Sequence, residues 1–379
     1  MMALDSDWTI LKMTIAKIAM LSAAVVLSAS AVHAQDVDPG AWDPHAAAAY
    51  LDQRVEWWSG WETAARERGT FCVSCHTTGP YGLARPMLRP AGGASEASPS
   101  ERALLDSVAT RVIGWTEMAP FYPDERYGVP KTSESRGTEA ILNALVLARR
   151  DARTGTLSDL ALRAFDNLWA LQETSGAAEG AWPWLHFNLA PWESDEGPYH
   201  GAALAAVAVG LAPAEYASRP DVRERTAHLG DYLRRRLDAQ PPFNRVMALW
   251  ASGALPGLLP DARQQTIVDE IAGLQREDGG WSLSSLGSWK RRDETPVDTG
   301  SDGYATGLAT LALQEAGLSR GHDAVADGLA WLARNQDADG SWPASSLNRQ
   351  HDPASDRGRF MRDAATAYAV LALTAAGGH

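Results

Sequence analysis

The chain has 379 residues, of which 45% are hydrophobic and 21% charged, a balance typical of a globular protein with a sizeable core. Its formal net charge is −13 and no basic stripe runs along it, which argues against a nucleic-acid partner.

The N-terminal 34 residues are typical of a secretory signal peptide. Lys17 precedes an apolar run over residues 18–34, which ends in the small-x-Ala pattern of Val32-His33-Ala34. We expect cleavage before Gln35, export to the periplasm, and an over-called start before Met13. An uncleaved anchor is the alternative. No later stretch is predicted to span a bilayer.

The only two cysteines occur in Cys72-Val-Ser-Cys75-His76, the Cys-x-x-Cys-His pattern. Two cysteines at i and i+3 with a histidine directly after are what the thioether attachment of haem c requires. We therefore predict one covalent haem, with Cys72 and Cys75 as the attached residues and His76 as the proximal iron ligand. A disulfide, a zinc site or a dithiol redox pair is the alternative, although no second pair of zinc ligands lies nearby.

The sixth ligand of the predicted iron is open on sequence grounds. Met118 follows at a distance typical of a cytochrome methionine ligand, and Met87, His186 and His200 are alternatives. Core packing is the usual role of a single methionine. A vacant sixth position would instead favour oxygen or peroxide chemistry.

Six helical hairpins are predicted along the chain, each an outer helix followed by an inner one. Outer helices carry charge on one side, whereas inner helices are rich in Ala, Leu and Gly on all faces, which indicates complete burial. The expected pairs are 44–69 with 80–89, 101–115 with 137–150, 157–172 with 197–212, 221–237 with 242–255, 261–275 with 305–317, and a helix ending at residue 336 with one at 365–377.

The last two hairpins form a clear internal repeat. Gln275 and Trp281 in "LQREDGGWS" correspond to Gln336 and Trp342 in "NQDADGSWP", with six positions from Gln to Trp in both. Asp and Gly fill the turn between them, where Gly supplies positive φ. The Cys-x-x-Cys-His segment occupies the same turn of the first hairpin.

Six such hairpins predict an all-α (α/α)6 toroid over residues 35–379, with inner-helix N-termini gathered around the mouth of a cavity. Asp302 and Asp363 stand just before inner helices, which predicts either N-caps or members of that ring. A separate small cytochrome domain over residues 45–125 is the alternative. The other residues expected at the cavity are Tyr81, Glu139, Trp184, Tyr199, His200, Tyr304 and Tyr368.

"QREDGGW" and "QDADGSW" resemble the QW motifs of squalene-hopene cyclases and protein-prenyltransferase β subunits, and the likeness is good from about Asp261 onwards. The resemblance implies an α/α toroid whose apolar cavity holds an isoprenoid chain, with Gln275, Trp281, Gln336 and Trp342 as structural residues. Cyclases of this kind protonate their substrate from Asp-x-Asp-Asp. The nearest segment here is Asp298-Thr-Gly-Ser-Asp302, which makes Asp298 and Asp302 the catalytic candidates and departs from that pattern.

Together these features predict an exported haem c protein on a cyclase-like toroid, acting in redox chemistry or electron transfer near a hydrophobic ligand. One alternative is a terpenoid cyclase-like lyase or isomerase that uses Asp298 or Asp302 as its acid. Another is a non-enzymatic electron carrier or scaffold. A hydrophobic small molecule and a redox partner protein are the expected partners, and association with a membrane surface stays open.

Overall fold

The computed structural model describes residues 42–89 and 96–375 of the chain. Every regular element in this part is a helix, and extended segments pair there only in two isolated bridges. The predicted signal peptide lies outside the described residues. The all-α class expected from the sequence is confirmed.

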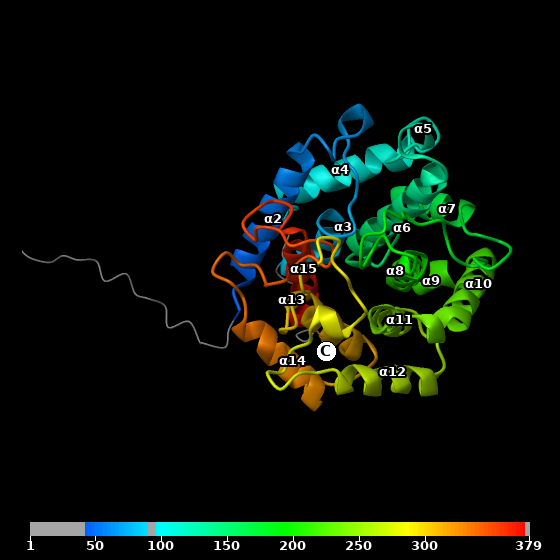
Figure 1. Ribbon diagram of the computed structural model, residues 1–379. Coiled ribbons are helices and arrows are strands. Elements are labelled where there is room, and N and C mark those ends of the chain that lie inside the picture. Colours follow the sequence, from blue (N-terminus) through cyan, green and yellow to red (C-terminus); the bar gives the residue numbers. More distant parts are fainter. Residues whose placement is uncertain (1–41, 90–95, 376–379) are drawn as a thin grey trace, which may run out of the picture. The chain divides into compact units, whose positions relative to one another are not determined.

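An inner ring of helices lies within an outer layer, as Figure 1 shows. Six helices of the described residues form this ring. They are α3 (Thr78–Ala84), α6 (Lys131–Ala152), α8 (Gly197–Leu211), α11 (Pro242–Ala254), α13 (Gly303–Glu315) and α15 (Phe360–Ala375). Each packs against the next in this order, and α15 packs against α3. The ring is therefore closed, as the predicted toroid requires, and the short helix after the Cys-His segment completes it.

Six further helices form the outer layer around this ring in the part of the chain that is described. They are α2 (Pro44–Gly60), α4 (Pro99–Ile113), α7 (Asp159–Ala170), α10 (Pro220–Arg236), α12 (Asp261–Gly273) and α14 (Asp323–Arg334). Each packs on the inner helix of the hairpin before its own: α4 on α3, α7 on α6, α10 on α8, α12 on α11, α14 on α13, and α2 on α15. Neighbouring hairpins are interlocked by this offset.

Short helices complete the connections. They are η1 (Glu67–Gly69), η2 (Arg85–Leu88), α5 (Asp124–Tyr127), α9 (Ala214–Ala217), η3 (Leu237–Ala239) and η4 (Leu283–Ser285).

The first outer helix is shorter than the sequence predicts. It ends at Gly60 instead of residue 69, because the chain then reverses and pairs with itself. Ala65 and Phe71 form a bridge, and the Cys72 N–H donates to the Ala64 carbonyl at 3.0 Å. This reversal sets the position of the Cys-His segment.

The inner helices approach one another closely because their contact faces carry small residues. At Gly307 of α13, an added Cβ would lie 2.6 Å from the backbone nitrogen of Ala369 on α15. Only glycine permits that separation. Ala, Leu and Val on the remaining faces of these helices are buried, which gives the ring a continuous apolar core.

Glutamines that follow three of the outer helices tie their hairpins to the next one. In three hairpins the glutamine Nε2 donates both to a glycine carbonyl in its own turn and to a carbonyl near the start of the next outer helix. The pairs of acceptors are Gly180 and Arg225 for Gln172, Gly279 and Ala324 for Gln275, and Gly340 and Asp43 for Gln336. Since Asp43 caps α2, the last tie joins the sixth hairpin to the first.

The connections that run from outer to inner helices meet at one end of the ring. Asn348, in the sixth hairpin, accepts from the Ala190 N–H at 2.8 Å and donates to the Ala190 carbonyl at 2.7 Å, in the connection of the third. Arg292, in the fifth, donates to the carbonyls of Phe187 and Asn188. We call this the connection end, and the Cys-His turn belongs to it.

Candidate functional site

The Cys72-x-x-Cys75-His76 segment forms the turn between α2 and α3 at the connection end. Trp58 of α2 donates its indole hydrogen to the Cys72 carbonyl at 2.8 Å. Both cysteines are buried free thiols. The backbone of the turn is thus fixed by its own outer helix, and the two sulfurs are left unbonded.

This arrangement reverses the one in the fifth and sixth hairpins. Trp281 and Trp342 lie in their turns and donate indole hydrogens to carbonyls of the outer helices, those of Ile271 and Leu332, both at 2.8 Å. In the first hairpin the indole comes from the outer helix and the turn supplies the carbonyl. The place of the turn tryptophan is therefore free for the Cys-His residues.

Burial makes the two thiols poor nucleophiles. It raises the pKa of Cys72 to about 11 and the pKa of Cys75 well above its ordinary value. A dithiol exchange enzyme needs the opposite shift, since the thiolate is the attacking species. The environment of the pair does not favour dithiol exchange.

His76 lies in an aromatic pocket formed by three elements. Its ring stacks on Phe360 of α15 with centroids 4.1 Å apart, meets the Trp58 edge at 5.1 Å and lies 5.8 Å from Trp192. Burial, together with the nearby Arg54 guanidinium, lowers the pKa of His76 to about 3. The imidazole is therefore neutral at pH 7, the form that binds a metal ion.

A buried hydrogen-bond network supports this imidazole. The Nδ1 of His76 lies 2.8 Å from the Thr77 hydroxyl, which donates to Asp363 at 2.6 Å. Asp363 also accepts from the Arg54 Nε at 2.7 Å and from the Tyr50 hydroxyl at 2.9 Å. The network spans the junction between the first and last hairpins.

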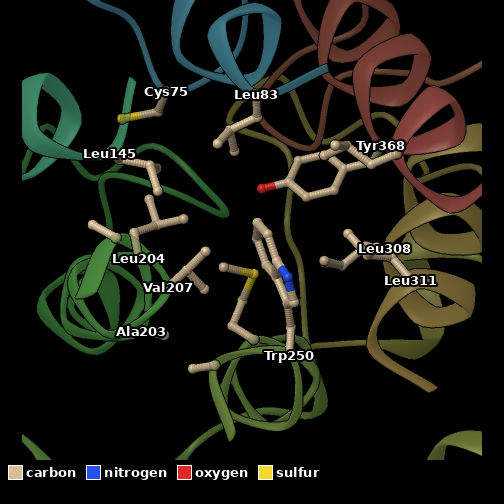
Figure 2. Close-up of a cluster of buried hydrophobic side chains, with 14 of the residues drawn as sticks. Cys75, Leu83, Leu145, Ala203, Leu204, Val207, Trp250, Leu308, Leu311 and Tyr368 are labelled. Carbon is tan, nitrogen blue, oxygen red and sulfur yellow. The ribbon is translucent and has the colours of Figure 1, made fainter. Parts of the chain in front are cut away.

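The core of the ring lies beside the same turn. Figure 2 shows side chains from all six inner helices facing one another, with the Cys75 sulfur at the edge of the group. The labelled members are Leu83, Leu145, Ala203, Leu204, Val207, Trp250, Leu308, Leu311 and Tyr368. An apolar molecule that entered this region would be next to Cys75.

Two tyrosines bring hydroxyl groups into this apolar region, with rings 5.1 Å apart. The Tyr304 hydroxyl accepts the indole hydrogen of Trp192 at 2.9 Å. The Tyr368 hydroxyl points towards the middle of the group in Figure 2 and has no hydrogen-bond partner among the described residues. Burial raises the pKa of both, so both hydroxyls keep their hydrogens.

The two catalytic candidates differ in environment. The Asp298 side chain is 70% exposed and pairs with Arg291 at 3.2 Å. Asp302 is the N-cap of α13, and its carboxylate accepts the backbone N–H groups of Leu283, Tyr304 and Ala305. Burial outweighs these bonds and raises the pKa of Asp302 to about 7. Asp302 could thus carry a proton near neutral pH.

The structure corrects the expected position of Asp363, which lies in the first turn of α15 and not before that helix. Glu139, expected at the cavity, lies inside α6, which begins at Lys131. Each is instead a buried partner of an arginine, Arg54 for Asp363 and Arg111 for Glu139. Their carboxylates are used in ion pairs between elements, which is why they tolerate burial.

Trp184 and His200 lie together inside the third hairpin. The Trp184 indole donates to the Trp192 carbonyl at 2.8 Å, and its ring meets His200 at 5.9 Å. His200 also stacks on Phe243, and its buried Nδ1 has no partner among the described residues. Burial lowers the pKa of His200 to about 3. It is a second neutral imidazole in the core.

Met118 and Tyr81 have structural surroundings. Met118 is buried in the connection after α4, where its sulfur would lie 3.0 Å from a Cβ added at Gly114. Met118 stands outside the main hydrophobic cluster of the described residues, to which Cys72 and Cys75 belong. The Tyr81 hydroxyl donates to Asp52 at 2.6 Å, on the outer side of α3.

Three residues near the turn were not predicted from the sequence: Arg54, Thr77 and Glu193. Arg54 and Asp363 are 309 positions apart, and no local pattern marks them as a pair. Burial raises the pKa of Glu193 to about 7, and its carboxyl acts electrostatically on both cysteines. In the sequence, the aromatic-rich segment over residues 182–200 is the one feature that could have marked the connection that contains Glu193.

The described surface pockets lie elsewhere. One of about 710 Å³ is lined by the C-terminal parts of α11, α13 and α15, including Gly253, Gln314 and Ala375. Within the described ranges, no group of three His, Cys, Asp or Glu residues could hold a metal ion, and no helix has the length and apolarity to cross a membrane.

Residues 254–355 match the family model of the squalene-hopene cyclase C-terminal domain. The matched segment covers α12, α13 and α14 with their connections, including both clear repeats of the Gln-Trp motif. No curated protein matches the chain. The family match and the closed ring together support a squalene-hopene cyclase-like toroid.

Proposed function

We propose that this chain is an exported haem c protein on a cyclase-like toroid, and that it performs redox chemistry or electron transfer beside an apolar core. The observation that carries the proposal is the Cys72-x-x-Cys75-His76 turn, with two free thiols and a neutral imidazole. The donor set fits haem c: two sulfurs for thioethers and one imidazole for iron.

In this proposal Cys72 and Cys75 hold the haem, and His76 binds its iron. When bound, haem supplies one-electron transfer or oxidation. The chain's own residues would do the rest: Phe360, Trp58 and the inner-helix side chains exclude water from the imidazole and from the core. Met118 remains a proposed sixth ligand, and export rests on residues 1–34.

The proposed ligand of the core is a hydrophobic small molecule, isoprenoid-like in the sense of the family match. The side chains shown in Figure 2 supply an apolar surface next to Cys75, and the Tyr368 hydroxyl adds one hydrogen-bond donor. A redox partner protein would deliver or remove electrons at the connection end.

The test is the optical spectrum of the protein exported to a periplasm that attaches haem c. We expect the alkaline pyridine spectrum of haem c in the parent protein and none in Cys72→Ala/Cys75→Ala. Reduced spectra with and without carbon monoxide would tell whether the sixth position is open. An exported parent protein that shows no haem spectrum would contradict the proposal.

The family match favours a second candidate, a terpenoid cyclase-like lyase or isomerase. Asp302 would be its acid, since burial raises the pKa of Asp302 to about 7. Turnover of a polyprene that survives Cys72→Ala but is lost in Asp302→Asn would support this candidate over the first. Turnover that is lost in Cys72→Ala and kept in Asp302→Asn would reject it.

A further inference from the structure

The hydrogen bonds around His76 determine which of its ring nitrogens carries the hydrogen. Thr77 Oγ1 lies between the His76 Nδ1, at 2.8 Å, and Asp363 Oδ2, at 2.6 Å. A hydroxyl has one hydrogen to donate. If that hydrogen goes to the carboxylate, Thr77 can only accept from His76, so Nδ1 must carry the ring hydrogen.

We call the two hydrogen bonds from His76 through Thr77 to Asp363 the relay. Their direction depends on Asp363 acting as a hydrogen-bond acceptor. Its other oxygen receives the Arg54 Nε hydrogen at 2.7 Å and the Tyr50 hydroxyl hydrogen at 2.9 Å. Arg54 is itself buried, which leaves its positive charge in direct contact with the carboxylate. The ionised form of Asp363 satisfies all three donors, whereas a protonated Asp363 would leave the guanidinium charge without its closest partner.

We propose that Thr77 and Asp363 are positioning residues, which fix His76 in the Nδ1–H tautomer and leave the Nε2 lone pair as its metal-binding atom. A histidine ligand is usually held in this way, because a hydrogen bond from its second nitrogen sets the ring orientation and makes the ligand more basic. The tautomer follows from the hydrogen-bond geometry together with the ionised carboxylate that the buried Arg54 guanidinium stabilises. The effect on iron rests on the proposed function.

The same contacts couple this ligand to closure of the ring. His76 and Thr77 belong to the first hairpin, whereas Asp363 and Phe360 belong to the last. An imidazole in a turn would otherwise rotate about its side-chain bonds. Here the ring is clamped on one face by Phe360 and at Nδ1 by the relay, both of which form only when α15 packs against α3.

The first test needs no haem. The full chain is expressed without export, so that its thiols stay free, and its histidines are labelled with ¹⁵N. Long-range ¹H–¹⁵N correlation spectra at pH 7 then report which nitrogen of each ring is protonated, and His76→Gln identifies the His76 signals. We expect the Nδ1–H tautomer; the Nε2–H tautomer in the parent chain would overturn the proposal.

Two variants separate the effect of the Thr77 hydroxyl on the tautomer from the effect of its methyl group. Thr77→Val keeps the shape and removes the relay, so Nε2–H should become populated; Thr77→Ser keeps the relay and should retain Nδ1–H. Because the parent spectrum decides the tautomer, the test stands even where Thr77→Val folds poorly. An unchanged tautomer in a folded Thr77→Val chain would show that the relay does not set it.

The second test uses the haem-loaded protein and measures its midpoint potential. Losing the hydrogen bond that Nδ1–H donates to Thr77 makes His76 a weaker electron donor to oxidised iron. Thr77→Val should therefore raise the midpoint potential, while Thr77→Ser leaves it near that of the parent. Equal midpoint potentials in all three proteins would contradict the proposed effect of this hydrogen bond on the iron. Absence of haem in the parent would reject the proposed function, and the tautomer would still be decided by the first test.

Discussion

Gln336 and Asp43 are 293 positions apart and hydrogen bond to each other through two pairs of atoms. The Asp43 N–H donates to the Gln336 Oε1 at 2.6 Å, and the Gln336 Nε2 donates to the Asp43 carbonyl at 3.0 Å. Asp43 also caps α2 through its side chain. One glutamine thus joins the last turn of the repeat to the start of the first hairpin.

Gln336→Ala should therefore destabilise the whole ring. It removes the two bonds to Asp43 and a third to the Gly340 carbonyl, for a loss of about 2 kcal/mol in the free energy of unfolding, measured in urea. Gln265→Ala is the control, since Gln265 is exposed on α12 and should cost less than about 0.5 kcal/mol. Equal effects of the two substitutions would contradict this role.

Removing the hydroxyl of Tyr304 should destabilise the fold more than removing the hydroxyl of Tyr368. Tyr304→Phe leaves the buried Trp192 indole without its acceptor and should cost about 1–3 kcal/mol of unfolding free energy. Tyr368→Phe removes a hydroxyl that has no partner among the described residues and should be neutral or stabilising. Urea unfolding of both variants checks this, and a loss above about 1 kcal/mol in Tyr368→Phe would reveal a partner for that hydroxyl.

Close packing in the third hairpin depends on Gly201. A Cβ at this position would overlap the Trp184 ring, so Gly201→Ala should lower the unfolding free energy by about 1–3 kcal/mol. Gly273→Ala is the matched control: nothing lies within 4 Å of its added Cβ at the end of α12, and alanine is the better helix former there. Thermal unfolding should rank the control at or above the parent, and the reverse order would contradict the packing argument.

Asp302 should make the folded state less stable as the pH rises from about 4 to 7. Burial raises its pKa to about 7 in the folded chain, whereas an unfolded aspartate titrates near about 3.9. Between these values the unfolded chain releases a proton that the folded chain retains, so rising pH favours unfolding. The stability that this retained proton gives the folded chain is fully lost above about pH 7.

Asp302→Asn isolates this effect, because asparagine also serves as an N-cap and does not titrate. We expect the parent's unfolding free energy, measured relative to that of Asp302→Asn, to fall across this pH window. A rise instead would mean that the three backbone N–H groups hold the pKa of Asp302 low, and would remove the acid required by the cyclase candidate.

The sequence predicts the fold closely and the site only in part. Helical periodicity and the Gln-Trp repeat give the six hairpins, since both are local patterns of small, apolar and turn residues. The end of α2 at Gly60 was missed because the pairing of Ala65 with Phe71 opposes a helix that local composition allows.

The surroundings of His76 could not be read in the same way. The Cys-x-x-Cys-His spacing marks the turn, but Arg54 and Asp363 come together only when the ring closes. Asp363 was expected before its helix because an aspartate near a helix start usually caps it. Here the cap interpretation fails because a buried arginine on α2 offers the carboxylate a stronger partner inside the first turn.

Burial of the two thiols has a consequence for the order of events during synthesis. Thr77 and Asp363 are separated by 286 positions, which a ribosome covers in roughly 15–60 s at about 5–20 residues per second. Throughout that interval α15 does not yet exist, and the turn has neither Phe360 nor Asp363 against it. Any enzyme that modifies Cys72 or Cys75 therefore meets an accessible substrate only on the growing or newly made chain. Completion of the last hairpin ends that opportunity.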